Sequence, residues 1–530
     1  MLKAFTQKKI LQFSLIKFIF SLSLFFTIFD NFAFYRNILK YYPLQLENLL
    51  FLLSIIFLLF CSINIVLLLF CFRSICKQVA ILFLIISAVV SYFSDSYNVV
   101  IDHTMIQNVL QTNKKEAFEL LNLKLFGYLF FLGILPSFFF IFIKIEKKSF
   151  GKEILEKLKL LIGIIIIVVI TILIFGKYYA TFFREHKELR YYANPTYYVY
   201  SLYKYIEINV KSQTKIKTRV AEDAFIPQSE RGRKLCILVI GEAARADRFS
   251  LNGYHRNTNP LLLTEKENIV VFSDFFSLAT STATSLPLIF SFYNSYEKAT
   301  RRENVLDVLM RCGVNILWRD NNSSSKGVAA DSIYQSFVDT NNFDEIMLNG
   351  LTEYIENKKS GDILIVLHQL GSHGPKYNIR YPEEFALFKP LPAANTPLEK
   401  WTKEELDNAY DNTILYTDYF LYKAIELLKM YSDKYKTILI YTSDHGESLG
   451  EKGIFLHGLP MIIAPKEQKH IMTFIWFGEL YKSEIDINIL RDKASREHFD
   501  HKIIPHTLLG FFKVKTKIYN PVLDVFNVSK

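Results

Sequence analysis

Long apolar runs dominate the first third of the chain. A helix needs about 20 apolar residues to cross the hydrocarbon core of a bilayer, and the shorter runs reach that length with their flanks. Residues 1–176 are therefore predicted to form a transmembrane domain. Its five expected spans are Leu11–Phe34, Leu49–Phe72, Val79–Phe93, Leu125–Ile143 and Leu160–Phe175.

The basic residues between these runs predict the orientation. They gather before the first run, between the second and third, and between the fourth and fifth, as at Lys8, Arg73 and Lys148. Basic loops stay in the cytoplasm, so everything after Phe175 is expected on the outer side. A cleaved signal peptide is the alternative for the first run, but no small-residue cleavage site follows it, which favours an anchor.

Residues 177–233 form a bridge that is rich in tyrosine. Asn194-Pro195 has the form of a helix N-cap followed by proline at the first helical position. Tyrosine rings favour the boundary between hydrocarbon and water. An amphipathic helix lying along the membrane interface is therefore expected here.

From residue 234 onward the pattern changes to short apolar strands that alternate with helical segments, of which Asn412–Met430 is the clearest helix candidate. Alternation of this kind is typical of a mostly parallel sheet covered on both faces. Residues 234–530 are therefore predicted to form an exported α/β domain. The predicted strands are Leu235–Ile240, Val314–Trp318, Ile363–Leu367, Thr437–Tyr441 and Ile471–Phe477.

Charge and cysteine content add two limits. The formal net charge is +10, but much of it lies in the predicted cytoplasmic loops, so it indicates no nucleic-acid partner. Only Cys236 and Cys312 lie in the exported part, without a CxxC pair. The outer domain must therefore be stabilised by packing of its core rather than by a disulfide framework.

Metal-binding residue types follow several predicted strands. The carboxyl ends of parallel strands meet at one edge of a sheet, so side chains placed there converge despite long sequence separations. Carboxylate and imidazole ligands suit a catalytic zinc ion, and manganese is the alternative where oxygen ligands dominate. The residues in question are Glu242, His368, His373, Asp444, His445 and His457.

Two further segments fit a phosphoryl-transfer site. The run Ser277–Pro287 is rich in hydroxyl groups, and a divalent cation can stabilise the alkoxide of such a group for attack on phosphorus. The run Arg319–Lys326 follows another strand and offers donors for phosphate oxygens.

A polar stripe marks the stretch between the third and fourth spans, near residues 102–118. Asn108, Thr112 and Glu116 recur every four residues and would share one face of a helix on the outer side of the membrane. Such a face is either simply solvated or holds a lipid head group.

Taken together, these motifs resemble those of the lipid A phosphoethanolamine transferases, the family that includes the mobile colistin-resistance proteins. The resemblance covers essentially the whole chain. The motifs that carry it are Gly241–Arg248 with Asn252-Gly253-Tyr254, Thr280–Ala283, Trp318–Asn322, Leu367-His368-Gln369 with His373-Gly374-Pro375, and Ser443–Gly450 with Leu456-His457-Gly458.

The resemblance implies an alkaline-phosphatase or sulfatase-like domain, and it implies roles for residues that match the family motifs. Thr282 corresponds to the nucleophile, and Asn108, Thr112 and Glu116 to residues associated with the lipid substrate. The implied zinc ligands are Glu242, Thr282, Asp444 and His445. His373, His457 and Lys326 resemble positions that bind the substrate phosphate or a second zinc, with His368 nearby, and Asn322 is also expected to bind substrate.

Two departures from the family pattern are visible. Leu278-Ala279 stands where many relatives carry Cys-Gly before the nucleophile, and Ala243 replaces a hydroxyl residue after the glutamate ligand.

The expected protein is a monomeric, multi-pass enzyme of the bacterial inner membrane with its catalytic domain in the periplasm. It would move phosphoethanolamine from phosphatidylethanolamine to lipid A or lipooligosaccharide through a covalent threonine intermediate, which would favour polymyxin resistance. The alternatives are a phosphoglycerol transferase or sulfatase-like hydrolase on the same domain, or a tethered binding protein that has lost its metal.

Overall fold

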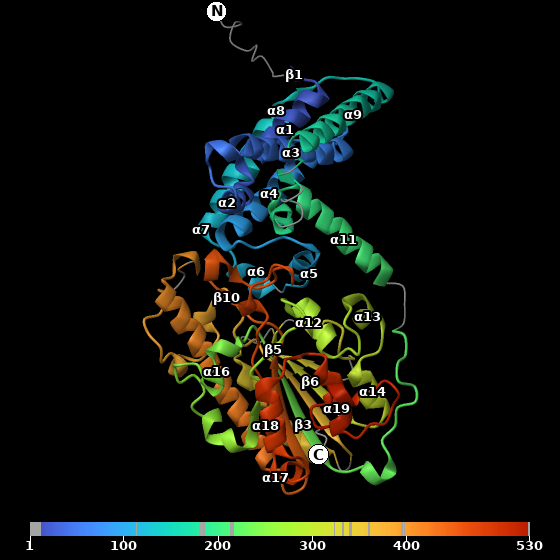
Figure 1. Cartoon of the computed structure of the whole chain (residues 1–530), viewed down its shortest axis with the longest axis vertical. Coiled ribbons are helices and arrows are strands. Elements are labelled where there is room, and N and C mark those ends of the chain that lie inside the picture. The colour runs from blue at the N-terminus through green and yellow to red at the C-terminus, as the bar shows by residue number, and fades with distance from the viewer. Residues whose placement is uncertain are drawn as a thin grey trace, which may run out of the picture. The chain divides into compact units, whose positions relative to one another are not determined.

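The apolar helices and the α/β sheet separate into two units in a computed structural model of the chain (Figure 1). One unit comprises residues 1–106 and 121–205, and the other comprises residues 107–120 and 206–530. The structure describes residues 12–112, 114–176, 178–179, 182, 186–212, 217–322, 324–330, 333–338, 342–358, 361–393, 396 and 398–527.

The first unit is helical, and among its described residues four helical segments are long and apolar enough to cross a membrane. A fifth span exists if the bent pair α1 and α2 is counted as one. The helical elements of the first unit are α1 (Leu15–Phe29), α2 (Phe32–Tyr41), α3 (Leu46–Phe70), α4 (Cys76–Tyr97), α7 (Leu123–Tyr128), the π-helix η1 (Leu129–Ile134), α8 (Leu135–Phe142) and α9 (Phe150–Ile174). The next helix, α11 (Thr196–Ser212), begins in this unit, and its residues from Ile206 onward belong to the second unit.

The first predicted span, Leu11–Phe34, is not one straight helix. It breaks between α1 and α2, whose axes differ by 56°. The Asn31 side-chain amide donates to the carbonyl of Phe26 at 2.9 Å, and the N–H of Ala33 bonds the carboxylate of Asp95 at 2.8 Å. Polar side chains therefore replace the helical ladder at the break, which the apolar pattern alone does not reveal.

The second unit is built around a seven-stranded sheet, which confirms the predicted α/β class. The strand order is β4-β12-β9-β3-β8-β6-β7; β9, β3, β8, β6 and β7 run parallel, while β12 is antiparallel to both neighbours. The strands are β3 (Lys234–Gly241), β4 (Ile269–Val271), β6 (Asn315–Asp320), β7 (Tyr334–Ser336), β8 (Ile363–His368), β9 (Lys436–Ser443) and β12 (Thr473–Phe477).

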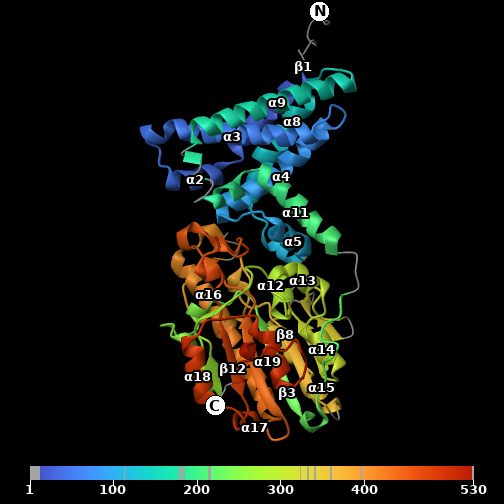
Figure 2. The same cartoon turned by 45° about the vertical axis from the view of Figure 1, so that its right-hand side comes forward.

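Helices cover both faces of this sheet (Figures 1 and 2). Alternate residues of β3, such as Cys236, Leu238 and Ile240, join one buried core with α12, α14 and α19, while α16 lies on the other side. The helices of this unit are α12 (Thr282–Ile289), α13 (Tyr296–Arg301), α14 (Val305–Arg311), α15 (Leu351–Asn357), α16 (Lys403–Lys429), α17 (Glu479–Lys482), α18 (Ile487–Arg496) and α19 (Ile503–Phe511).

The main helix of this unit is longer than its sequence pattern indicates. The prediction was Asn412–Met430, whereas α16 begins at Lys403. Thr402 caps it, because its hydroxyl accepts the N–H of Glu405 while the Glu405 carboxylate accepts the N–H of Thr402.

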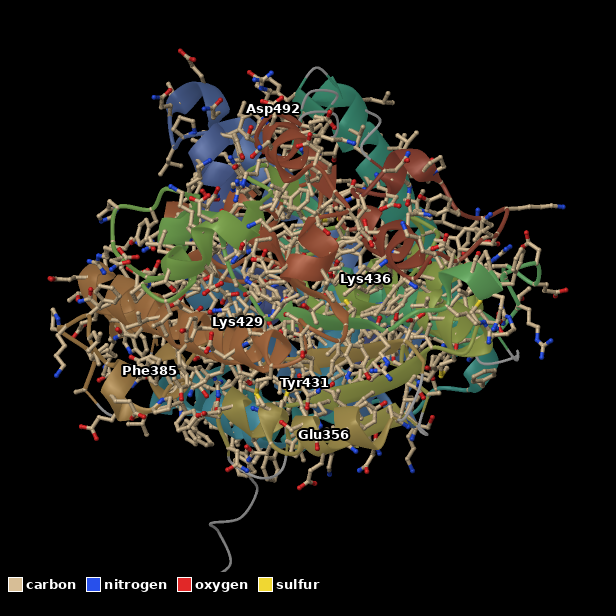
Figure 3. The ribbon with its side chains drawn as sticks, turned by 90° about the horizontal axis from the view of Figure 1, so that it is seen from below. Glu356, Phe385, Lys429, Tyr431, Lys436 and Asp492 are labelled. Carbon is tan, nitrogen blue, oxygen red and sulfur yellow. The ribbon has the colours of Figure 1, made fainter. Side chains whose placement is uncertain are left out.

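The ends of the parallel strands place the chemistry at one edge of the sheet. Figure 3 looks at the opposite edge, where Lys436 opens β9. The register aligns Gly241 at the end of β3 with Ser443 at the end of β9, and Ile240 with His368 at the end of β8. Loops that leave these strands therefore start side by side.

We expect Tyr441→Phe to raise the melting temperature of the full chain. Tyr441 of β9 is fully buried, and its hydroxyl has no hydrogen-bond partner among the described residues. Removing an unsatisfied buried hydroxyl should stabilise the fold by about 1 kcal/mol. Tyr410→Phe is the matched control with the opposite expected sign, because the Tyr410 hydroxyl donates to the carbonyl of Ala243 at 2.6 Å. An equal fall in melting temperature in Tyr441→Phe and Tyr410→Phe would contradict this assignment.

We expect His506 of α19 to make stability depend on pH. Its Nδ1 accepts the N–H of Asn520 at 3.1 Å, and burial lowers the pKa of His506 to about 4. The unfolded chain therefore binds a proton that the fold excludes, so stability present above about pH 6.5 is lost as the pH falls toward 4. The melting temperature should fall less steeply between pH 6.5 and 4 in His506→Gln than in the wild type. Equal slopes of melting temperature against pH in the two proteins would contradict the assignment.

Candidate functional site

Glu242, Asp444 and His445 meet where β3 and β9 end. Glu242 follows β3 directly, and Asp444 follows β9, with its N–H bonded to the carbonyl of Gly241 at 2.9 Å. All three side chains are fully buried, and one ligand atom from each lies within 4.8 Å of the others. The strand ends thus bring together two carboxylates and an imidazole, as the sequence predicts.

Thr282 completes this group from α12. It is the first residue of that helix, and its hydroxyl lies 2.9 Å from Glu242 Oε2 and 3.3 Å from His445 Nε2. The N-terminus of a helix carries a partial positive charge, which favours an oxygen atom that becomes negative. The N-terminus of α12 therefore favours an alkoxide at Thr282, whereas the nearby carboxylates of Glu242 and Asp444 oppose one unless a cation offsets their charge.

One ring nitrogen faces three oxygens in this group. His445 Nε2 lies 3.3 Å from Glu242 Oε1, from Asp444 Oδ2 and from Thr282 Oγ1. A tetrahedral zinc ion with bonds of about 2.0–2.1 Å separates its ligand atoms by about 3.3–3.4 Å. The distances from His445 Nε2 to these three oxygens therefore match the separation of ligand atoms around one small divalent cation.

The hydrogen bonds leave the inward-facing carboxylate atoms without a donor. Glu242 Oε2 accepts from Asn322 at 2.7 Å, and Asp444 Oδ1 accepts the N–H of His445 at 2.7 Å. The other oxygens, Glu242 Oε1 and Asp444 Oδ2, have no hydrogen-bond partner among the described residues. The His445 ring bonds the carbonyl of Gly446 through Nδ1 at 2.8 Å, which orients Nε2 toward the carboxylates. The donor set thus fits a metal.

The electrostatics of the group follow from burial and from like charges. Burial raises the pKa of Asp444 to about 6, and the nearby charge of Glu242 adds to this effect. Burial alone would lower the pKa of His445, but Asp444 and Glu242 raise it to about 10. The same imidazole holds the pKa of Glu242 well below its usual range, against the effect of burial. The group requires a positive partner, either a proton or a metal ion.

A second group lies beside the first. His373 and His457 together with Glu242 could also hold an ion, as could His445, Glu447 and His457. Glu447 is already engaged, because its two carboxylate oxygens bond the hydroxyl of Tyr377 at 2.5 Å and Nδ1 of His457 at 2.8 Å. Glu447 therefore orients His457, and neither of its oxygens is left without a partner.

The backbone is tightly fitted around Glu242. Ala243 has a positive φ of 55°, and it is held by bonds from its N–H to Asp444 Oδ1 at 3.2 Å and from the Tyr410 hydroxyl to its carbonyl. A Cβ at Gly371, where φ is 48°, would lie 3.0 Å from the carbonyl oxygen of Glu242. Strained positions of this kind persist where neighbouring contacts fix them.

The other predicted residues of this domain occupy different positions around the group. Asn322 bonds both Glu242 and the carbonyl of Gln369. His368 is buried behind it, with Nδ1 2.9 Å from Asp320, whose charge raises the pKa of His368 against the effect of burial. Lys326 lies half-buried in the turn after β6, with a positive φ of 49°.

The polar stripe near residues 102–118 differs from the expected single helix. Two short helices occupy it, α5 (His103–Gln111) and α6 (Lys114–Glu119). Thr112 lies between them, and its hydroxyl bonds the carbonyl of Asn108 at 2.7 Å, a local bond that competes with the helical ladder. The side chain of Glu116 lies outside the described part of the chain, so a common face for all three residues stays a prediction.

Sequence reasoning missed several polar residues around the group. Asp320 and Glu447 bond the rings of His368 and His457, and the Asp344 carboxylate accepts the N–H groups of Leu370 and Gly371. Asp320 and Glu447 lie inside motifs that had been singled out, which is the signal that could have identified them. Asp344 lies in no recognisable motif, and its bonds to Leu370 and Gly371 are apparent only in the folded structure.

Comparison with known proteins supports the same picture. Residues 59–210 match the family described as phosphoethanolamine transferase EptA/EptB, and residues 234–514 match the sulfatase family. Phosphatidylethanolamine transferase Mcr-1 of Escherichia coli is 41% identical over 518 residues, covering 93% of this chain and 94% of its own. Phosphoethanolamine transferase EptA of Escherichia coli K12 is 38% identical, with 94% of each chain covered.

The fold of the whole chain has a solved counterpart. The integral membrane protein lipooligosaccharide phosphoethanolamine transferase A of Neisseria meningitidis superposes with a TM-score of 0.92 at 31% identity, covering 98% of this chain and 99% of that one. The predicted membrane anchor and periplasmic α/β domain are thereby confirmed. The chain belongs to the phosphoethanolamine transferase EptA/EptB family and is a membrane-anchored transferase with a sulfatase-like domain.

Proposed function

We propose that this transferase takes phosphoethanolamine from phosphatidylethanolamine and passes it to lipid A or lipooligosaccharide, with Thr282 as the covalent carrier and zinc as the metal. The observation that supports this most strongly is the set of 3.3 Å separations between His445 Nε2 and oxygens of Glu242, Asp444 and Thr282. The names of the relatives add the donor, phosphatidylethanolamine, and one acceptor, lipooligosaccharide.

Glu242, Thr282, Asp444 and His445 would hold the metal. A bound zinc ion would lower the pKa of the Thr282 hydroxyl and offset the negative charge of the phosphate. Zinc is expected over manganese because an imidazole and carboxylates form the ligand set. The two free carboxylate oxygens, Glu242 Oε1 and Asp444 Oδ2, are the atoms that need such a cation.

The first step forms a bond between Thr282 Oγ1 and the phosphorus of the donor. The bond from phosphorus to the diacylglycerol oxygen breaks, and that oxygen leaves and takes up a proton. Thr282 Oγ1 is hydrogen-bonded to Glu242 Oε2 at 2.9 Å, which fixes the direction of its lone pairs. His373, His457 and Lys326 would bind the phosphate oxygens, and Asn322, whose two N–H groups bond Glu242 and Gln369, would hold Glu242 in place.

The second step forms a bond between an acceptor oxygen and the phosphorus, and the bond to Thr282 Oγ1 breaks. When the acceptor is a phosphate of lipid A, it loses an ionisable oxygen and gains an ethanolamine amine, so its net negative charge falls. Cationic peptides such as polymyxins would then bind the envelope more weakly through reduced Coulomb attraction. The enzyme would act as a monomer, with Asn108, Thr112 and Glu116 near the lipid substrate and His368 supporting the site.

Metal analysis distinguishes the two groups of possible ligands. We expect the purified full chain to retain zinc after dialysis, and Asp444→Asn to lose it, because this variant removes one of the two free carboxylate oxygens. Glu447→Gln should retain it, because the Glu447 oxygens already bond Tyr377 and His457. Retention by Asp444→Asn, or loss only in Glu447→Gln, would place the first metal elsewhere.

The covalent step is tested with Thr282→Ala. Mass spectrometry of lipid A and core from cells that express the wild type should show added phosphoethanolamine, and the variant should show none. Thr280→Ala is a nearby control that keeps Thr282 and should still modify lipid A. The Thr280 hydroxyl donates to the carbonyl of Leu459 at 2.6 Å and not to the proposed metal ligands. Modification that survives in Thr282→Ala would contradict the proposal, and release of free phosphoethanolamine without lipid modification would favour the hydrolase.

A further inference from the structure

Residues 107–120 connect two membrane helices in sequence but pack within the catalytic unit. In Figures 1 and 2 this segment, marked by α5, lies beside α12 and α13. Its first residue, Gln107, is buried and donates from Nε2 to the hydroxyl of Tyr296 at 2.5 Å. Tyr296 opens α13, which follows the helix that begins with Thr282.

The far end of the segment is held by an ion pair between Glu119 and Arg380. The two terminal nitrogens of Arg380 donate to the two carboxylate oxygens of Glu119, one of them at 3.1 Å. The side chains are only 2% and 7% exposed for Arg380 and Glu119 respectively. A buried two-point pair of this kind is geometrically specific, and removal of one partner leaves an uncompensated buried charge.

Arg380 also contacts the backbone of the proposed phosphate-binding site. Its Nε donates to the carbonyl of His373 at 2.7 Å. His373 belongs to the group with Glu242 and His457 whose ligand atoms lie within 4.8 Å. The guanidinium of Arg380 therefore connects the carboxylate of Glu119 to His373, whose imidazole lies beside Glu242.

We propose that Arg380 is a positioning residue that makes the placement of His373 depend on docking of residues 107–120 through Glu119. The consequence is that the phosphate side of the site is complete only when this segment is seated. This inference rests on the proposed function, because it assigns a control of the same site.

The bonding pattern separates this role from simple stabilisation. In the exchanged pair Glu119→Arg with Arg380→Glu, an ion pair can form again, but a carboxylate at position 380 has no N–H to donate to the carbonyl of His373. A purely structural pair predicts that the exchange restores both stability and turnover. A positioning role predicts that it restores stability alone.

The test uses the full-length protein with phosphatidylethanolamine vesicles and purified lipid A, and it measures melting temperature, zinc content, kcat and KM. Glu119→Arg alone should lower the melting temperature, and the exchange should recover it. Turnover should stay reduced by about tenfold or more in the exchange, because misplacement of a substrate-binding group costs at least that much. Zinc content should match the wild type.

Arg311 provides a control with the same bonding pattern away from the site. Its guanidinium donates to Glu303 at 2.8 Å and to the carbonyl of Val220 at 2.6 Å. Exchange of Glu303 and Arg311 should leave kcat unchanged. A single substitution, Glu119→Gln, serves if the exchanged protein does not fold. It leaves the buried charge of Arg380 uncompensated, so it should lower the melting temperature, and it should also lower kcat at temperatures where the variant is still fully folded.

Wild-type turnover in the Glu119–Arg380 exchange would overturn the inference, as would full kcat in Glu119→Gln. If the wild type itself transfers no phosphoethanolamine while it retains zinc, the proposed function fails, and the inference fails with it. The two failures are therefore distinguishable in one set of assays.

Discussion

The structure depends on two buried carboxylates that converge on one imidazole nitrogen. Glu242 and Asp444 are fully buried, and each has one oxygen bonded to protein donors and one that faces His445 Nε2. Two like charges so close in a dry site are strongly unfavourable without a positive partner. The raised pKa values of Asp444, about 6, and His445, about 10, express this conflict. The fold maintains an arrangement that a bound divalent cation would stabilise.

The sheet and its surroundings hold these carboxylates in place. Register along β3 and β9 brings Gly241 opposite Ser443, so the residues that follow leave the sheet together. Around them lie polar side chains that each orient another: Asp320 orients His368, and Glu447 orients His457. Carboxylates behind imidazoles fix the ring orientation and make the facing nitrogen a better ligand. The carboxylates of Asp320 and Glu447 thus hold the rings of His368 and His457 in fixed orientations beside the site.

The sequence predicted those parts of the fold that local pattern controls. The apolar β-branched runs located β3, β8 and β9 to within one or two residues, and the convergence of strand ends located Glu242, Asp444 and His445. The break between α1 and α2 and the early start of α16 are accompanied by side-chain bonds of Asn31 and Asp95 and of Thr402 and Glu405. Periodicity does not record such bonds.

Residues that act over long sequence distances were beyond local pattern. Glu119 and Arg380 are 261 positions apart, and neither lies in a recognisable motif. Their pairing becomes visible only when residues 107–120 are seen to pack on the catalytic unit. The same holds for Asp344, which bonds the Leu370-Gly371 turn against Glu242. Only the folded chain reveals these partners.

The most direct test is anomalous diffraction at the zinc edge from crystals of the full chain grown with zinc. The anomalous map should show a peak at bonding distance from one oxygen each of Glu242, Thr282 and Asp444 and from Nε2 of His445. A peak bound only by His373, Glu447 and His457, or no ordered peak beside Thr282, would contradict the central claim that these four residues share one metal ion.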